Sequence, residues 1–319
     1  MKGINRIRYL PISFYSIILG LVGFTIAFQK AEQMLGMPFV ISPYILISAL
    51  ASFAVITILY LTKTIVFPGD VLREFRHPTK LNFFSAFSIS LLLFSVAFLS
   101  VNVSVAKYLW IVGVILHFLF TIGVFSFWIQ HDKLEIIHMN PAWFIPVVGN
   151  ILVPVAGVTF FSSEISWFFF SIGLGMWISL FAILINRLIF HRPIHEKLLP
   201  TLFILIAPPA VGFISYVKLT DSINDFAKIM FYFALFMLVM LVSQVKYLHT
   251  SKFYLSWWAY SFPVSAITIA TSLMFHKTDE IFFKGLSYIL LFVLCLIVIG
   301  LVVNTIKAIR DKQICVRDD

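Results

Sequence analysis

The chain has 319 residues, of which 61% are hydrophobic and only 12% are charged. A soluble domain carries about 25% charged residues and has no means of covering so much apolar surface. Continuous apolar runs of about twenty residues also exclude a transmembrane barrel, whose strands alternate apolar and polar residues. The net charge of +9 lies in the loops, so we expect no nucleic-acid partner. The composition predicts an all-α integral membrane protein that contacts membrane lipid.

Ten apolar runs are long enough to cross a bilayer as helices. In chain order they cover residues 11–29, 41–66, 81–101, 107–128, 141–161, 165–185, 198–217, 226–245, 254–275 and 283–306. The first run follows basic residues, as a signal peptide does, but no small-x-small cleavage site follows it, so we predict that it is the first span. The connections are short, and we expect a single transmembrane domain over residues 1–319.

Positive charge alternates from one loop to the next. If the N-terminus is cytoplasmic, 17 of the 23 Lys and Arg residues lie on the cytoplasmic side and 6 on the other. This asymmetry follows the positive-inside rule. We therefore predict a multi-pass protein of the cell inner (plasma) membrane with cytoplasmic N- and C-termini.

Apart from positions near span starts, proline occurs only in odd-numbered spans: it interrupts the fifth, seventh and ninth, whereas glycine (Gly20 and Gly23) interrupts the first. Proline inside a helix removes a hydrogen bond, and the freed carbonyl needs shielding by neighbours or a wet cavity. The predicted helix kinks are Pro146, Pro154, Pro208, Pro209 and Pro263. Breaks in alternate spans predict five helix hairpins in a quasi-fivefold bundle, with the odd-numbered helices inside and lining a central pore.

Small and polar residues recur at helical spacing on one face of each odd-numbered span. The stripe in the ninth span is the cleanest, with the spacing i, i+4, i+7, i+11. The predicted pore wall consists of Ser13, Ser16, Gly20, Ser85, Ser88, Ser95, Asn150, Pro154, Gly157, Pro208, Gly212, Ser215, Ser261, Ser265, Thr268 and Ser272. For any single stripe, close helix packing through small residues is the favoured alternative. Recurrence in five spans favours a pore.

No Asp, Glu, Lys or Arg lies well inside a predicted span. Proton-coupled pumps and voltage sensors place charges there, so a passive pore that selects by diameter and dipoles is favoured. The exposed N–H groups of broken helices favour anions. His117 is the one titratable group at membrane depth. A neutral His117 bonded to a neighbouring helix is favoured over a proton relay.

The sequence contains no motif that indicates an enzyme, a cofactor or a metal site. His191 and His195 are four residues apart, but Pro193 places them in a loop without a carboxylate cluster. His77, His131 and His138 are also in predicted loops. No CxxC pair, nucleotide-binding loop or nucleophile–base pair is present.

Phe262 lies beside the polar stripe of the ninth span and directly before Pro263. A bulky ring at a kink on a pore wall is able to occlude the pore. From the residues alone, a Phe that packs between helices is the favoured alternative.

Four segments resemble spans of the TehA and slow anion channel family. Leu10–Tyr15 with Leu19–Leu21 is similar to its first span, Pro141–Pro146 with Gly149 and Asn150 to its fifth, Ala207–Pro209 to its seventh, and Trp257–Pro263 to its ninth. The ninth-span segment is the most specific match, and the resemblance covers essentially the whole chain.

The resemblance implies a homotrimer with one pore per subunit, in which Phe262 occludes the pore as a gate. It implies a passive, gated channel for small monovalent anions such as chloride and nitrate. The alternative is a secondary transporter or exporter of dicarboxylates, tellurite or sulfite. Coupled transport usually needs a titratable group in the spans, and only His117 supplies one. A membrane enzyme or receptor would need a polar cluster at one membrane face, which the sequence lacks.

Overall fold

Ten helices long and apolar enough to cross a membrane make up most of the computed structural model, which describes residues 4–130, 134–248 and 252–316. They follow the predicted order, so the prediction of an all-α, ten-span membrane protein is confirmed. Lys2, Lys133 and Arg317, which were counted for orientation, and the loop residue His131 lie outside the described residues.

The even-numbered spans are uninterrupted α-helices of 19 to 30 residues. They are α3 (Ser42–Val66), α6 (Val103–Gln130), α8 (Ser163–Phe190), α10 (Asp225–Ser243) and α13 (Ile281–Arg310). Their outer faces expose large apolar side chains such as Ile65, Phe190 and Ile281. Such faces are stable only in contact with lipid or another protein.

Each odd-numbered span begins as a 3-10 segment and continues as an α-helix. The pairs are η1 (Ile12–Phe14) with α2 (Tyr15–Met34), η2 (Leu81–Phe84) with α5 (Ser85–Phe98), η4 (Pro141–Phe144) with α7 (Ile145–Phe160), η5 (Glu196–Ile206) with α9 (Ala207–Thr220), and η6 (Leu255–Tyr260) with α12 (Ser261–Thr278). Within an 18-residue apolar stretch of each of these spans, 72% to 94% of the residues are buried inside the protein. The corresponding share in the even-numbered spans is 22% to 39%. The odd-numbered spans are therefore the inner helices.

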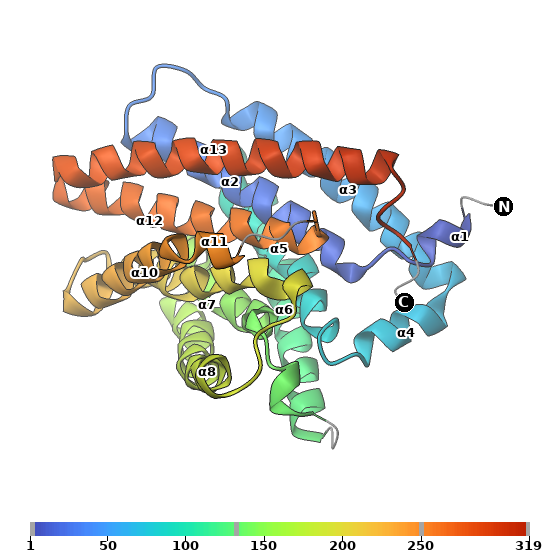
Figure 1. The fold of residues 1–319 in the computed structure, drawn as a ribbon. Helices are drawn as coiled ribbons and strands as arrows, with labels where there is room; N and C mark the ends of the chain where they lie inside the picture. Colours follow the sequence, from blue (N-terminus) through green and yellow to red (C-terminus); the bar gives the residue numbers. More distant parts are fainter. Residues whose placement is uncertain (1–3, 131–133, 249–251, 317–319) are drawn as a thin grey trace.

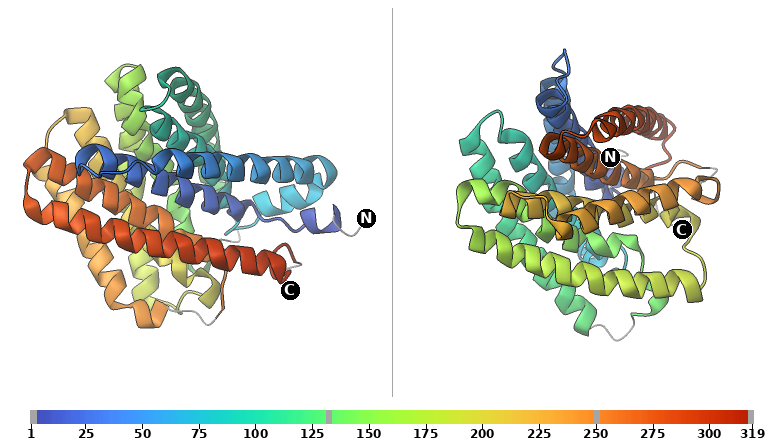
Figure 2. Two further views of the ribbon diagram at one scale, coloured as in Figure 1. Left: turned by 90° about the horizontal axis from the view of Figure 1, so that it is seen from above. Right: turned by 90° about the vertical axis from the view of Figure 1, so that its left-hand side faces the viewer.

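The inner helices form a closed ring. Helix α2 contacts α5, α5 contacts α7, α7 contacts α9, α9 contacts α12, and α12 contacts α2 again. Each inner helix also packs against the outer helix that follows it in the chain. Figure 1 shows two of these hairpins, with α13 running along α12 and α3 beside α2, and Figure 2 shows the bundle from two further directions.

Four of the five prolines predicted as kinks lie at the junction between a 3-10 segment and an α-helix. Pro146, Pro208, Pro209 and Pro263 each fall within the first three residues of their α-helix. The N–H groups of these positions have no partner inside an α-helix, so proline removes no α-helical hydrogen bond there. Pro154 lies inside α7.

Short helices gather at one end of the bundle. The charged connection between the second and third spans contains the helix α4 (Pro68–Phe75), which contacts α3. The helix α1 (Ile4–Ile7) also contacts α3, and the Arg6 guanidinium donates a hydrogen bond to the Lys312 carbonyl. The helix α1 and the residues that follow α13 therefore lie close together (Figure 1). The remaining short helices are η3 (Ile136–His138) and α11 (Val245–Leu248).

Candidate functional site

A cavity of about 1350 Å³, here called the vestibule, opens at the end of the bundle that carries α4. All five inner spans contribute residues near their N-terminal ends, among them Ser13, Phe83, Ile145, Thr201 and Ala259. The positive ends of five helix dipoles therefore point toward the vestibule, and this arrangement favours anions.

The charged lining of the vestibule is mostly basic. Its charged residues are Arg8, Lys63, Asp70, Arg73, Glu74, Lys80, Lys197 and Lys252, and His77 and His195 also line it. The lining thus contains six Lys and Arg residues but only two carboxylates. Because a concave surface with low-dielectric walls focuses the field, the vestibule concentrates anions.

A second cavity, here called the chamber, has a volume of about 30 Å³ and lies inside the ring of inner helices. Its lining residues are Gly23, Ile26, Leu93, Val96, Leu152, Val155, Val211, Ile214, Phe262, Ser265, Ala266 and Ile269. Every inner helix contributes at least two of them. This space would hold about two water molecules at most, and small apolar cavities stay dry. The chamber is therefore a small space between the five inner helices, and its lining is apolar apart from Ser265.

Phe262 lines both cavities. It is the second residue of α12, directly before Pro263, and its ring lies close to Gly23 of α2. A Cβ atom at Gly23 would lie 3.4 Å from the Phe262 Cδ2 atom. The ring therefore borders both a wide, basic cavity and a small, mostly apolar one.

The predicted pore-wall residues are distributed unevenly around these two cavities. Ser13 and Ser16 line the vestibule, and Ser265 lines the chamber. The linings of the two cavities do not include Gly20, Ser85, Ser88, Ser95, Asn150, Pro154, Gly157, Pro208, Gly212, Ser215, Ser261, Thr268 or Ser272. For these residues a pore-lining role stays a prediction.

Several of these residues make contacts within or between helices. The hydroxyls of Ser265, Thr268 and Ser272 donate to carbonyls one turn earlier, at 2.9, 2.7 and 3.0 Å. A Cβ atom at Gly20 would overlap the Ser261 hydroxyl, so the small residues of α2 and α12 allow these helices to pack closely.

His117 of α6 is the centre of a buried polar network. Its Nε2 atom donates to the Pro146 carbonyl at 2.7 Å, and its Nδ1 atom lies 2.9 Å from the Ser88 hydroxyl. The Asn150 amide also donates to the Pro146 carbonyl, at 2.8 Å. His117 thus bonds α5 and α7, which is the arrangement that the sequence favoured over a proton relay. Gly149 makes room for the ring, because a Cβ atom there would overlap it.

A buried ion pair at the rim of the vestibule was not predicted from the sequence. The Lys63 ammonium lies 2.7 Å from the Glu74 carboxylate and donates to the Leu10 carbonyl at 2.8 Å. The Tyr60 hydroxyl donates to the same carboxylate at 2.9 Å. The missed signal is Pro68, which is typical of a helix start and turns the chain back toward α3.

A second ion-paired group lies nearby on α4. Asp70 accepts hydrogen bonds from Arg8, at 2.6 Å, and from Arg73. The hydrogen bond from Arg8 holds the pKa of the Asp70 carboxyl below its usual value. Both vestibule carboxylates are therefore paired with basic residues, and the vestibule as a whole keeps an excess of positive charge.

Comparison with known proteins places the chain in a family. A family model described as "Voltage-dependent anion channel" (SLAC1) matches residues 9–306, from ahead of the first span into the last turns of the tenth. The S-type anion channels SLAH2 and SLAH3 of Arabidopsis thaliana are 29% and 28% identical over 287 and 307 residues, or 88% and 94% of this chain. The chain spans about half the length of these relatives, 55% and 48%.

A bacterial relative has nearly the same extent. The "Tellurite resistance protein TehA homolog" of Haemophilus influenzae is 23% identical over 297 residues, which cover 92% of this chain and 89% of that protein. The resemblance noted in the sequence is confirmed, and this multi-pass membrane chain belongs to the SLAC1 family of voltage-dependent anion channels.

Proposed function

We propose that this chain is a passive, gated channel for small monovalent anions such as chloride and nitrate, and that Phe262 occludes its pore. The observation that carries the proposal is the position of Phe262, which lines both the vestibule and the chamber. An ion that moves along the axis of the helix ring, from the vestibule to the chamber, therefore passes this side chain.

The electrostatics of the vestibule support anion selectivity. Six Lys and Arg residues and five helix N-termini face the vestibule, and its two carboxylates are ion-paired. A field of this sign raises the local concentration of anions and lowers that of cations. The family is one of anion channels rather than enzymes.

The chamber supports passive conduction over coupled transport. Its lining carries no ionisable residue in the part of the chain that the structure describes. A pore without fixed charges binds ions weakly and is able to release them quickly. His117 does not line the chamber and is held by hydrogen bonds from two sides.

The remaining parts of the proposal concern placement and assembly. Residues 1–319 would form one transmembrane domain in the cell inner membrane, with both termini and the vestibule in the cytoplasm. The family resemblance further supports a homotrimer with one pore per subunit. Native mass spectrometry from detergent tests this assembly, since a trimer has three times the mass of the chain.

The test of the channel is current through planar bilayers that contain the purified protein under a chloride gradient. We expect small currents in the wild type and large, anion-selective currents in Phe262→Ala, because the ring no longer fills the passage. Phe83→Ala is the matched control, because Phe83 lines the vestibule but not the chamber, and it should behave like the wild type. No current in any variant, together with saturable flux that follows a proton gradient, would instead indicate a transporter and an ordinary packing role for Phe262.

A further inference from the structure

We infer that Lys197, Ser13 and Ser16 form a binding site for one small inorganic monovalent anion in the vestibule. The inference rests on the proposed function and goes beyond it, because it names the residues that hold the anion before it reaches Phe262. All three residues line the vestibule, as does Phe262.

The first step concerns the charges of the vestibule that are already paired. Arg8 and Arg73 bind Asp70, and Lys63 binds Glu74. Within the described part of the chain, the Lys197 ammonium has neither an ion pair nor a hydrogen bond. Lys197 is therefore a cation whose charge no neighbouring carboxylate neutralises.

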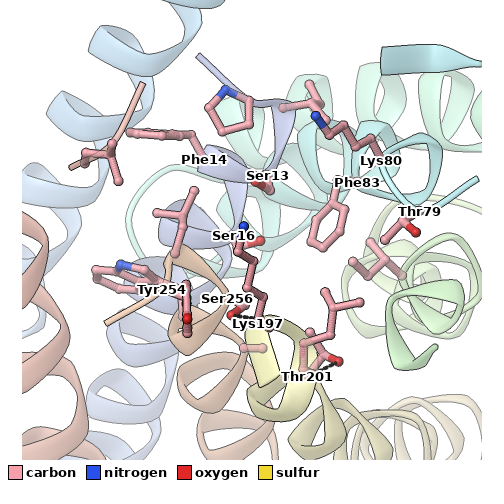
Figure 3. A pocket seen from close by; sticks show the side chains of 18 of the residues that line it. Ser13, Phe14, Ser16, Thr79, Lys80, Phe83, Lys197, Thr201, Tyr254 and Ser256 are labelled. Atoms are coloured by element: carbon pink, nitrogen blue, oxygen red, sulfur yellow. Dashed lines mark hydrogen bonds between the residues drawn. The ribbon is translucent and has the colours of Figure 1, made fainter. Parts of the chain in front are cut away.

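The second step concerns the hydrogen-bond donors near this charge. Ser13 lies in η1 and Ser16 one turn later in α2, so both hydroxyls lie on the same face of the span. Both residues are half-buried, and among the described residues neither hydroxyl has a hydrogen-bond partner. Figure 3 shows the Lys197 side chain extending into the cavity toward Ser13 and Ser16.

The third step is that the backbone of Lys197 is fixed in place. The Ser256 hydroxyl donates to the Lys197 carbonyl, and the Lys197 N–H donates to the His195 Nδ1 atom at 3.2 Å. The segment η5, which carries Lys197, packs against η6, and η6 also contacts η1. Because η6 leads directly into Phe262, the three donors are tied to the segment that carries the proposed gate.

The fourth step is the class of ligand that these donors select. One ammonium and two hydroxyls balance a single negative charge and replace only part of a hydration shell. These three residues supply no second positive charge for a dianion. The site therefore takes small monovalent anions, and chloride and nitrate are suitable probes.

The test is equilibrium binding of radioactive chloride to the purified full chain, which requires no current. We expect Lys197→Gln to weaken binding about fivefold, the effect of one nearby charge in a largely aqueous setting. Lys197→Arg should retain binding, since the charge remains. The matched control is Lys218→Gln, because Lys218 lies at the opposite end of the same span and should leave the affinity unchanged.

Conductance in the Phe262→Ala background gives a second readout. Lys197→Gln should lower the current at low chloride, and the difference should shrink at high chloride, where the site is saturated and the charge is screened. Unchanged binding and unchanged conductance in Lys197→Gln, or an equal loss in Lys218→Gln, would overturn the site. If Phe262→Ala passes no current while Lys197→Gln still loses chloride binding, the channel proposal fails and the site stands.

Discussion

At the residue scale, the buried pair of Lys63 and Glu74 joins α3 to α4 at the rim of the vestibule. Glu74→Gln would leave the Lys63 ammonium buried without its counter-ion. Removing one partner of a buried pair costs about 3–5 kcal/mol. We expect a loss of this order in the free energy of unfolding, measured by titration with a denaturing detergent.

The control for this prediction is Asp70→Asn on the same short helix. The Arg8 partner of Asp70 is exposed, and exposed pairs contribute only about 0–1 kcal/mol. Equal and small losses in the two variants would show that the Lys63–Glu74 pair does not hold α4 in place.

Gly149 gives a second prediction at this scale, because it lies directly against the His117 ring. A methyl group there would force the ring away from the Pro146 carbonyl. We expect Gly149→Ala to lower the free energy of unfolding by about 1–3 kcal/mol, as overpacking does. In a His117→Ala background the ring is absent, and the same substitution should be nearly neutral.

Gly175 of α8 is the matched glycine. Apart from the neighbouring backbone of its own helix, no atom lies within 4 Å of a Cβ atom built there, so Gly175→Ala should be neutral or slightly stabilising. A Gly149→Ala cost that persists without the His117 ring would contradict the proposed contact.

At the element scale, the five inner helices close the chamber with aliphatic side chains. Narrow apolar sections exclude ions because water leaves them. Val155→Thr and Val211→Thr keep the side-chain shape but add a hydroxyl that holds water. In a Phe262→Ala background we expect both substitutions to raise single-channel conductance in planar bilayers.

The control is Val153→Thr. Val153 is buried in α7, the helix that carries Val155, but it does not line the chamber. It should leave the conductance unchanged. If Val155→Thr and Val211→Thr also have no effect, the chamber does not limit ion flow once the ring of Phe262 has been removed.

Some features of the inner helices could be predicted from sequence patterns and others could not. Proline correctly marked the fifth, seventh and ninth spans as different from their neighbours, because its effect on the backbone is local. The same pattern did not reveal that every inner span starts as a 3-10 segment, including the first and third, which lack internal proline. Packing of five helix starts around one vestibule is a property of the assembled bundle.

At the scale of the whole molecule, the proposed topology makes a labelling prediction. Cys315 lines the vestibule, whereas Cys295 lies within α13. A membrane-impermeant maleimide should label Cys315 only after cells are permeabilised and should not reach Cys295. Ser222→Cys, in the exposed loop between α9 and α10, should be labelled in intact cells.

The pH dependence of this labelling follows from burial. Burial raises the pKa of the Cys315 thiol, so less of the reactive thiolate is present at neutral pH than in an ordinary cysteine. The labelling rate of Cys315 should therefore still be rising at a pH at which the Ser222→Cys thiol has levelled off. Labelling of Cys315 in intact cells would show that the chain has the opposite orientation to the one proposed.

The number of spans, their order and the alternation of two kinds of helix could all be predicted from the amino-acid sequence. These features depend on the length of apolar runs, on loop charge and on proline, all of which act along the chain. The sequence also singled out Phe262, through its place beside Pro263 and through the family resemblance.

Which side chains line the two cavities could be learned only from the folded bundle. The direction in which a side chain points depends on how its helix is rotated relative to the neighbouring helices. A stripe of polar residues is equally consistent with a pore wall and with a contact between helices. Ser88 and Asn150 lie within hydrogen-bond distance of the His117 ring, while aliphatic residues such as Leu152 and Val155 line the chamber. The pairing of Lys63 with Glu74 likewise required the fold of α4 back onto α3, because a charge finds its partner in space and not along the chain.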